Sequence, residues 1–377
     1  MVNVFTVPPG LCFVDALAAG LMAETGGDPL ALADGLVLLP TRRAARSLRE
    51  AFLRRSGGRA LLLPRIQPLG EVDDDELILG GGLELDLPPA APPLRRQLLL
   101  ARLVAQVGLD GRPPRIDQAV RLAAELAGFL DEVQTEGVPL DGLDGIVPGE
   151  LALHWQVTLD FLRILREHWP KILADEGAVD PAVRRDAALR TLARRWRERP
   201  PDGWVVAAGS TGGIPATHEL LQVIAGLPGG RVVLPGLDRQ MDDRSWDELD
   251  ASHCQWALKQ LVEALGLGRA DVEVWAPAGV EGSPPARARF LGEVMRPAAT
   301  TDAWQELPPP PPEALDGLGV EVTPDLPTEA LNLACRMRAA LEVPGRTAAL
   351  VTPDRNLARR VAVELQRWGI EVDDSAG

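Results

Sequence analysis

Short β-branched apolar runs, each followed by a turn and then by a helical pattern, open this sequence. Val4–Val7 is such a run, and Pro8-Pro9-Gly10 separates it from Val14–Met22, whose apolar residues have helical spacing. Gly35–Leu39 is a second run, and Arg42–Arg55 follows it with the pattern of an amphipathic helix. Because alternating strands and helices need crossover connections, the pattern predicts an α/β fold with a parallel sheet.

The stretch from Leu94 to Arg199 changes to helical patterns alone. Asp117 is the expected N-cap of one helix in it. Asp180 followed by Pro181 is expected to open another, because aspartate suits the N-cap and proline the first helical position. We therefore expect an all-helical insertion at residues 91–199.

The sheet pattern resumes after this insertion. Trp204–Ala208 and Arg231–Leu234 are expected strands, and Pro215–Ile224 is an expected helix between them. The first α/β domain would thus combine residues 1–90 with residues 200–305.

Five consecutive prolines, Pro308–Pro312, favour an extended and stiff spacer, so residues 306–318 are expected to be a linker. Beyond it, Gly319–Thr323 and Thr347–Val351 have the composition of strands. Residues 319–377 would then be the truncated start of a second α/β domain.

The chain has two lysines, Lys171 and Lys259. A P-loop needs glycines that expose backbone N–H groups and a lysine that reaches the outer phosphates, in the order GxxxxGK[ST]. Lys171 follows Pro170 and Lys259 follows Leu258, so neither lies in such a motif. The unit Val4–Met22 has the strand–loop–helix shape of a nucleotide site without its charge, and tight triphosphate binding is not expected there. A nuclease that needs a lysine just after its carboxylates is not expected either.

Metal and cofactor sites are not expected in this chain. Its three cysteines are far apart and its four histidines lack HExxH spacing. The acidic runs Asp73–Glu76 and Asp242-Asp243 are more typical of solvated surface than of a metal site. Residues 1–39 have neither the basic start of a signal peptide nor the unbroken apolar run of a membrane span. A reduced cytoplasm and no membrane contact are expected.

Three strand-end loops carry hydroxyl groups that suit a phosphate, and two of them, at residues 40–43 and 351–355, also carry arginines. A phosphate is favoured where a helix begins, because free N–H groups and the helix dipole meet there. The formal net charge of −15 argues against coating duplex DNA but leaves room for a narrow strip that holds one strand. For residues 40–43 taken alone, an ordinary N-cap, Thr41, followed by a solvated helix face is the favoured interpretation, and a phosphate contact is the alternative. The candidate DNA-binding residues are Thr41, Arg42, Arg43, Ser210, Thr211, Thr352 and Arg355.

Four segments closely resemble the AddB family of double-strand-break repair proteins, in its alphaproteobacterial type. They are LVLLPTRRAARSLREAFL at 36–53, LLLPRIQPLGEVDDDEL at 61–77, AAGSTGGIPATHEL at 207–220 and ALVTPDRNLARRVAVELQRWGIEVDDSAG at 349–377. Members of this family are far longer, so the chain would correspond to an N-terminal third or so.

The resemblance implies a RecA-like, superfamily-1 helicase-like fold that lacks a P-loop. It also implies a partner, AddA, that carries the active motor, and a complex that resects broken DNA ends before recombination. Single-stranded and duplex-end DNA would be the nucleic-acid partners. Residues 40–43 are similar to the helicase motif that contacts single-stranded DNA, and residues 351–353 to the entry of a second motor domain. The family's C-terminal nuclease and iron–sulfur cluster have no counterpart in these residues.

Two rival functions stay open on the sequence. One is an active ATP-dependent DNA helicase, which would need ATP to bind at Val4–Met22. The other is an α/β enzyme that binds a small nucleotide or sugar through the flexible loop Gly209–Gly213.

Overall fold

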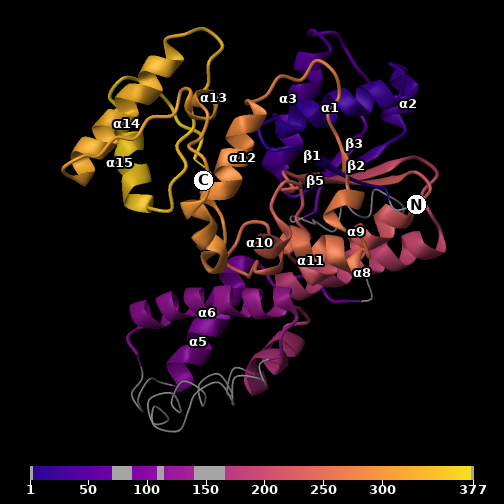
Figure 1. Ribbon diagram of the computed structural model, residues 1–377. Coiled ribbons are helices and arrows are strands. Elements are labelled where there is room, and N and C mark those ends of the chain that lie inside the picture. Colours follow the sequence, from indigo (N-terminus) through magenta and orange to yellow (C-terminus); the bar gives the residue numbers. More distant parts are fainter. Residues whose placement is uncertain (1–2, 70–86, 108–113, 140–165, 375–377) are drawn as a thin grey trace. The chain divides into compact units, whose positions relative to one another are not determined.

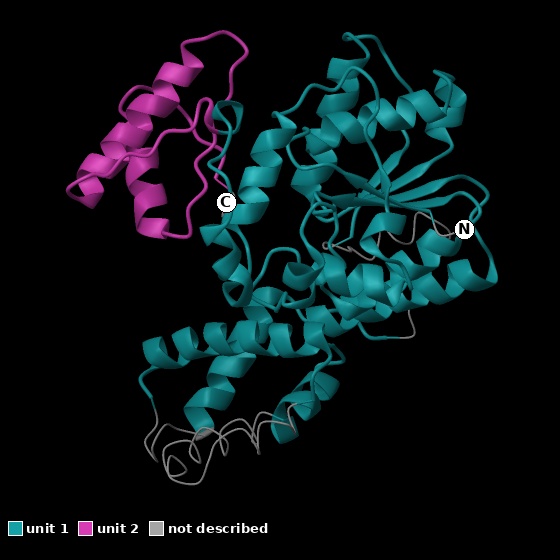
Figure 2. Cartoon of the chain, in the orientation of Figure 1, with its two compact units in different colours: residues 1–314 teal, residues 315–377 magenta. Residues whose placement is uncertain are grey.

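The computed structural model describes residues 3–69, 87–107, 114–139 and 166–374. The chain divides into two compact units, residues 1–314 and 315–377 (Figure 2). The division falls within the proline-rich stretch 306–318. The acidic run Asp73–Glu76 lies outside the described residues.

The first unit is built on a six-stranded sheet with the order β3-β2-β4-β5-β1-β6 (Figure 1). Every pairing between neighbouring strands is parallel, which confirms the predicted α/β class. The first strand lies inside the sheet, between β5 and β6. The strands are β1 Val4–Val7, β2 Leu36–Leu39, β3 Arg65–Pro68, β4 Val205–Ala208, β5 Gly230–Pro235 and β6 Glu273–Val274.

Helices connect the strands and cover the sheet. In the first unit they are α1 Phe13–Glu24, α2 Pro29–Ala33, α3 Arg42–Arg55, α5 Pro93–Val107, α6 Ile116–Glu136, α8 Pro181–Glu198, α9 Pro215–Gly226, α10 Asp243–Asp247, α11 Trp256–Ala264 and α12 Pro285–Val294. Two 3₁₀ segments, η2 Arg269–Asp271 and η3 Ala298–Gln305, complete it, and α13 Pro312–Leu315 spans the division between the units.

The two faces of the sheet have separate apolar cores. Helices α1 and α3 pack on one face, where Leu17 and Phe52 contact Val37 and Val206. Helices α8, α9 and α11 pack on the other face. Both β2 and β4 are buried at every position, as expected for central parallel strands covered on both sides.

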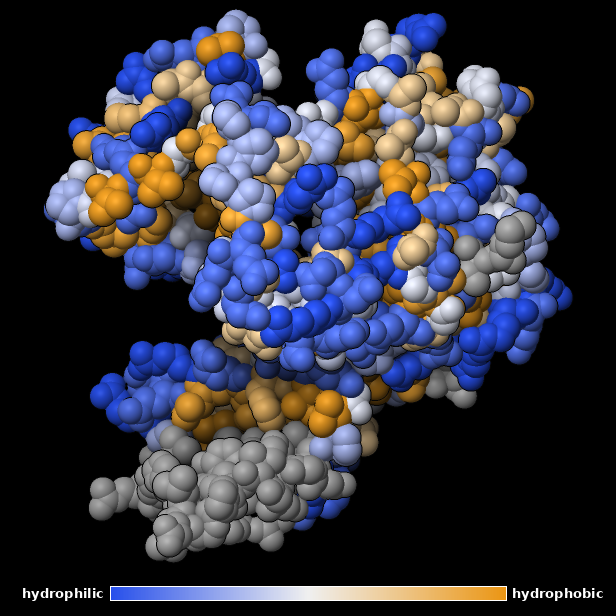
Figure 3. Space-filling view, viewed as in Figure 1, coloured by the Kyte–Doolittle hydropathy of each residue, from blue (hydrophilic) through white to orange (hydrophobic). Residues whose placement is uncertain are grey.

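The helical segment between β3 and β4 has its own core, formed by α5, α6 and the helical residues 166–175. Figure 3 shows apolar side chains gathered over α5 and α6, whereas hydrophilic residues cover much of the rest of this face of the first unit. Helix α8, which the sequence placed in the insertion, packs on the sheet instead through Leu189, Leu192 and Trp196. Helix α6 begins with Arg115 as its N-cap, so the prediction for Asp117 is wrong by two residues.

The second unit contains α14 Leu326–Leu341 and α15 Arg355–Gln366, packed on each other through a small apolar core. The expected strands Gly319–Thr323 and Thr347–Val351 are not formed. These segments have no regular secondary structure and pair with no strand among the described residues. The side chains of Val320 and Val351 are 96% and 94% exposed, so these segments have no sheet face to bury.

Candidate nucleic-acid interface

The sheet has two switch points, where neighbouring strands send the chain to opposite faces. The chain leaves β1 and β2 toward α1 and α3 on one face, and leaves β4 and β5 toward α9 and α11 on the other (Figure 1). Strands β1 and β5 are neighbours, and so are β2 and β4. In an open parallel sheet such diverging loops leave a crevice at the carboxyl ends of the strands, and ligands bind there.

The switch point at β1 and β5 is closed by the segment that leads into α12. Leu11 pairs with Gly282 in an antiparallel bridge, and the Ser283 backbone N–H donates to the Gly10 carbonyl at 3.0 Å. A cavity of about 160 Å³ remains, lined mainly by apolar groups such as Pro8, Pro9 and Val274. Pockets for small ligands span roughly 300–1,000 Å³, so this space is too small for a nucleoside triphosphate.

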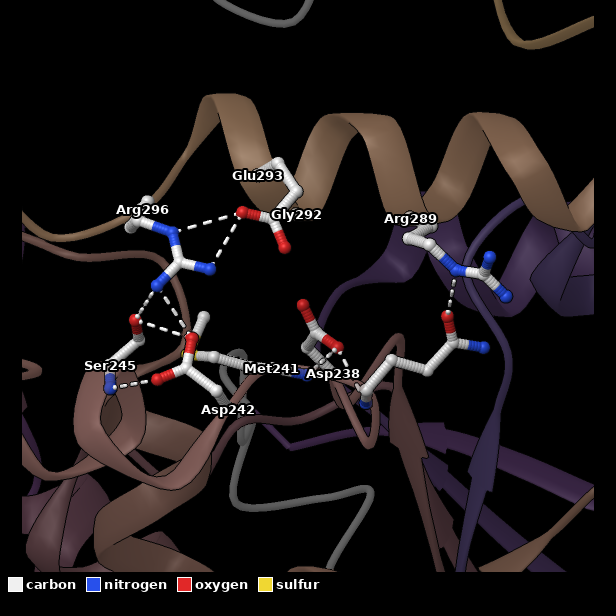
Figure 4. A pocket seen from close by; sticks show the side chains of 9 residues that line it. Asp238, Met241, Asp242, Ser245, Arg289, Gly292, Glu293 and Arg296 are labelled. Carbon is white, nitrogen blue, oxygen red and sulfur yellow. Dashed lines mark hydrogen bonds and ion pairs between the residues drawn. The ribbon is translucent and has the colours of Figure 1, made fainter. Parts of the chain in front are cut away.

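Arg296 holds α12 in this position (Figure 4). Its guanidinium donates to Asp242 at 2.6 Å, to Ser245 at 2.7 Å and to Glu293 at 2.7 Å, with the side chain only 10% exposed. Burial alone would raise the pKa of Asp242, but hydrogen bonds from Ser245 and the charge of Arg296 lower it below its ordinary value. A Cβ atom on Gly292 would lie 2.9 Å from Asp238 Oδ2, so α12 approaches the loop after β5 closely.

A carboxylate already lies at the start of α1, where a P-loop would hold phosphate. Asp15 is in the first turn of the helix and accepts a hydrogen bond from Arg54 at 2.9 Å. Burial alone would raise its pKa, but hydrogen bonds from Cys12 and Arg54 and the charges of Arg54 and Arg55 hold that pKa below its ordinary value. This fixed negative charge takes the favourable place at the helix dipole and repels a phosphate.

The switch point at β2 and β4 brings together two of the loops singled out in the sequence. Leu38 is level with Ala207 in the sheet, so Thr41 and Ser210 both follow the same edge. Gly209, with a φ of +75°, lies against Phe13 and Pro40: an added Cβ would be 3.2 Å from a ring carbon of Phe13 and 3.7 Å from Pro40 Cδ. Loops after β1, β2 and β4 therefore meet around Gly209.

Helix α3 begins at this edge as predicted. Thr41 is its N-cap, and the Thr41 hydroxyl accepts a hydrogen bond from the Ala44 N–H at 3.1 Å. Arg42 and Arg43 occupy the first two helical positions and are exposed. Both side chains already interact with other groups of the protein. A bound ligand would therefore replace those interactions or add to them.

The glycine-rich loop follows β4 at the same edge of the sheet. The Ser210 hydroxyl accepts a hydrogen bond from the Gly212 N–H at 3.2 Å, which orders the loop. Thr211 is partly buried. Helix α9 follows with Ile214 as its N-cap, which provides no side-chain hydrogen bond, so its first N–H groups rely on other acceptors.

Thr352 and Arg355 belong to the second unit and are described there alone. The Thr352 hydroxyl accepts a hydrogen bond from the Asp354 N–H at 3.1 Å, and Arg355 starts α15 and pairs with Asp374 at 3.3 Å. The structure thus groups Thr41, Arg42, Arg43, Ser210 and Thr211 on one edge of one sheet, and places the other two residues in a separate unit.

Phe13 packs against the loop after β4 but was not singled out in the sequence. Its ring lies against Gly209 because α1 begins at this residue, directly after the turn that leaves β1. No local pattern distinguishes such an aromatic residue from a core one, and only the order of the strands brings it beside β4.

No family model matches the chain, and no curated protein matches it either. Within the described residues, no three histidine, cysteine or acidic side chains are grouped so that they could hold a metal ion. None of the helices in that part of the chain is long and apolar enough to cross a membrane.

Proposed function

We propose that this chain is a helicase-like subunit that guides single-stranded DNA without hydrolysing ATP. In this proposal it is the N-terminal part of an AddB-family protein, pairs with AddA, and takes part in resection of broken DNA ends. The single observation that carries the proposal is the switch point at β2 and β4, where the loops after both strands leave the same edge of the sheet and meet around Gly209.

The chemistry of this switch point suits a DNA backbone. The starts of α3 and α9 both face the carboxyl edge and offer backbone N–H groups and the positive ends of two helix dipoles. Arg42 and Arg43 add positive charge at the first of these helix ends. Contacts of this kind position a strand through its phosphates and read no base sequence.

The closed switch point at β1 and β5 favours a subunit that guides DNA over one that hydrolyses ATP. The loop after β1 carries no lysine, packs against residues 282–283, and places Asp15 at the start of α1. A triphosphate at that position would meet a carboxylate and a cavity that is too small for it.

Binding of a fluorescently labelled oligothymidine to the 377-residue chain, followed by anisotropy over a range of salt concentrations, tests the proposed contact. In the double variant R42A/R43A we expect at least about tenfold weaker binding and a salt slope smaller by roughly 1–2, because two phosphate contacts are lost. The variant R115A/R121A removes the same charge from exposed positions on and beside α6 and should bind normally. Equal affinity of R42A/R43A and the wild type would refute the contact.

Two further measurements test the rest of the proposal. We expect no ATP turnover by the purified chain, with or without DNA, and turnover that survives purification to homogeneity would revive the active-motor alternative. We also expect the chain to co-purify with AddA when the two are produced together. Separate elution of the two proteins would remove AddA as the partner.

A further inference from the structure

A second pocket lies at the opposite edge of the sheet, between strands β2 and β3 and the C-terminal end of α8. It has a volume of about 400 Å³, within the range of small-molecule sites. Leu36, Leu38, Leu192 and Trp196 form an apolar floor. The residues at its rim precede their strands or end α8, so the pocket opens at the amino edge, away from the switch point at β2 and β4.

Three arginines line this pocket without a partner in the described part of the chain. The guanidinium groups of Arg65, Arg195 and Arg199 form no hydrogen bond or ion pair there, in a chain with 54 acidic and 39 basic residues. Elsewhere on α8, Arg190 and Arg197 both lie within 4 Å of the carboxylate of Glu219.

These arginines come from two elements that meet at the pocket. Arg195 is in the last turn of α8 and Arg199 is its C-cap with an extended backbone, so the negative end of the helix dipole favours both charges there. Arg65 lines the same pocket from β3. Asp34 and Asp202, which the structure describes, lie at the same rim but form no ion pair with these arginines, so the three guanidinium groups can still hold an anionic group such as a phosphate.

The rest of the pocket suits a heterocyclic base. Trp204 lines the pocket at the start of β4, but its indole packs with the apolar core on the other face of the sheet and donates its N–H to the Ala31 carbonyl at 2.9 Å. A Cβ on Gly35 would lie 2.1 Å from that ring, so glycine is needed for the ring to pack so closely. The carboxylates of Asp34 and Asp202 at the rim can accept hydrogen bonds from an exocyclic amino group.

We propose that this pocket binds a nucleoside phosphate, with the phosphate on Arg65, Arg195 and Arg199 and the base against the apolar floor of Leu36, Leu38, Leu192 and Trp196. The ligand is either a free nucleotide or one nucleotide of a DNA strand, since both present the same groups. The site is separate from the switch point at β2 and β4 and does not depend on it.

The test uses dAMP, inorganic phosphate and a labelled eight-residue oligodeoxyadenosine, each titrated into the full 377-residue chain. We expect at least one of the two nucleotide-bearing probes to bind, and binding to weaken by at least about tenfold in R195A/R199A, because two charge-assisted contacts are removed. The variant R190A/R194A takes the same charge from the same helix at residues that do not line the pocket, and it should bind within about twofold of the wild type. Thermal unfolding curves of both variants check that each is folded.

The outcomes separate the two sources of the nucleotide and the two proposals. Loss of dAMP binding in R195A/R199A indicates a free nucleotide, whereas loss of oligonucleotide binding alone indicates a nucleotide within a strand. R42A/R43A should retain the dAMP binding that R195A/R199A loses, whereas oligonucleotide binding should weaken in both double variants if a strand contacts both sites. Unchanged affinities in R195A/R199A would overturn the inference. Binding of inorganic phosphate as tight as that of dAMP or the oligonucleotide would overturn it as well, because it would indicate a simple anion site.

Discussion

Gly209 is the residue at which three loops of the proposed DNA interface meet. Its backbone has a φ of +75°, which L-residues with a Cβ rarely adopt, and a Cβ there would press on Phe13 at 3.2 Å. Gly57 offers a matched comparison, because its φ is +64° and a Cβ added to it would meet nothing within 4 Å.

The substitution Gly209→Ala is therefore expected to destabilise the first unit by roughly 1–3 kcal/mol, from backbone strain and from the contact with Phe13. Gly57→Ala carries the strain alone and should cost about 1 kcal/mol. Urea unfolding monitored by circular dichroism measures both. If the two variants lose the same stability, Gly209 does not pack as tightly between the loops as described.

Asp15 links the start of α1 to the stability of the fold. Its pKa is held below the ordinary value, so the unfolded chain binds this proton more readily than the folded chain. The stabilisation is complete above the unfolded pKa of about 4 and is lost as the pH falls through the lower folded value. Asp15→Asn removes a pair with Arg54 that is worth about 0.2–1 kcal/mol at neutral pH.

We expect the stability difference between wild type and Asp15→Asn to be constant from pH 7 to about pH 5 and to shrink below about pH 4. Denaturant unfolding at a series of pH values measures it. A difference that stays the same down to pH 3 would show that the carboxylate is not preferentially charged in the folded protein.

Sequence patterns predicted the position of a helix well where interactions within the segment itself determine where the helix begins and ends. Helix α3 has the predicted bounds, because the Thr41 hydroxyl caps its first turn and an apolar stripe through Leu48 and Phe52 faces the sheet. The arginine pocket had no such signal. Arg65 and Arg199 are separated by more than a hundred residues, and only the pairing of β2 with β3 and β4 puts them in one pocket.

At the scale of elements, the predicted N-cap residue of α8 has a different role: its side chain binds neighbouring helices and does not cap its own. Asp180 is the N-cap of α8, but its carboxylate does not cap the helix. It accepts hydrogen bonds from Arg96 at 2.7 Å, from Gln134 at 2.6 Å and from the Trp169 indole at 3.0 Å, and it is 2% exposed. This buried cluster joins α8 to α5, α6 and the helical residues 166–175.

Replacing Asp180 with alanine leaves Arg96 buried with one carboxylate fewer, and removing one partner of a buried pair costs about 3–5 kcal/mol. In this variant, amide hydrogens should exchange faster mainly in α5 and α6, because the core of these helices is separate from the two cores of the sheet. Hydrogen exchange followed by mass spectrometry resolves this. The exposed carboxylate of Asp117 provides the control, and Asp117→Asn should change stability by less than about 1 kcal/mol. Uniform loss of protection across the sheet as well would contradict a local role for the cluster.

The two strands expected in the second unit do not form, and the reason cannot be found in the sequence pattern of the segments themselves. Runs rich in valine favour strands, but residues 319–323 and 347–351 have no regular secondary structure. A strand also needs neighbours that complete its hydrogen bonds and bury one of its faces. That requirement concerns other parts of the chain, whereas β-propensity is read from the segment alone.

At the scale of the whole molecule, periodicity predicted the fold class but not the order of the strands. The alternation of strands and helices implied parallel pairing, which the sheet confirms. Nothing in the pattern indicated that β1 lies between β5 and β6, or that β2 neighbours β4. Both switch points follow from that order, and so do the closed position beside β1 and the proposed interface beside β4.

The two units differ in how much apolar surface they bury, and their stabilities should differ accordingly. The core of the second unit consists of Ala330, Ala334, Leu357, Val361 and Leu365, whereas the first unit has two large cores on the sheet and a third in its helical segment. So small a core seldom supplies more than about 3–5 kcal/mol.

We therefore expect amides in α14 and α15 to exchange with deuterium at least about a hundredfold faster than amides in β4 and β5, because local opening costs less where fewer apolar contacts must be broken. Limited proteolysis should remove the second unit first and leave the sheet intact. Equal protection in both units would mean that the second unit gains stability from contacts beyond its own core. That result would redirect attention to exposed residues such as Val320 and Val351, since an apolar surface of that kind is stable only when something covers it.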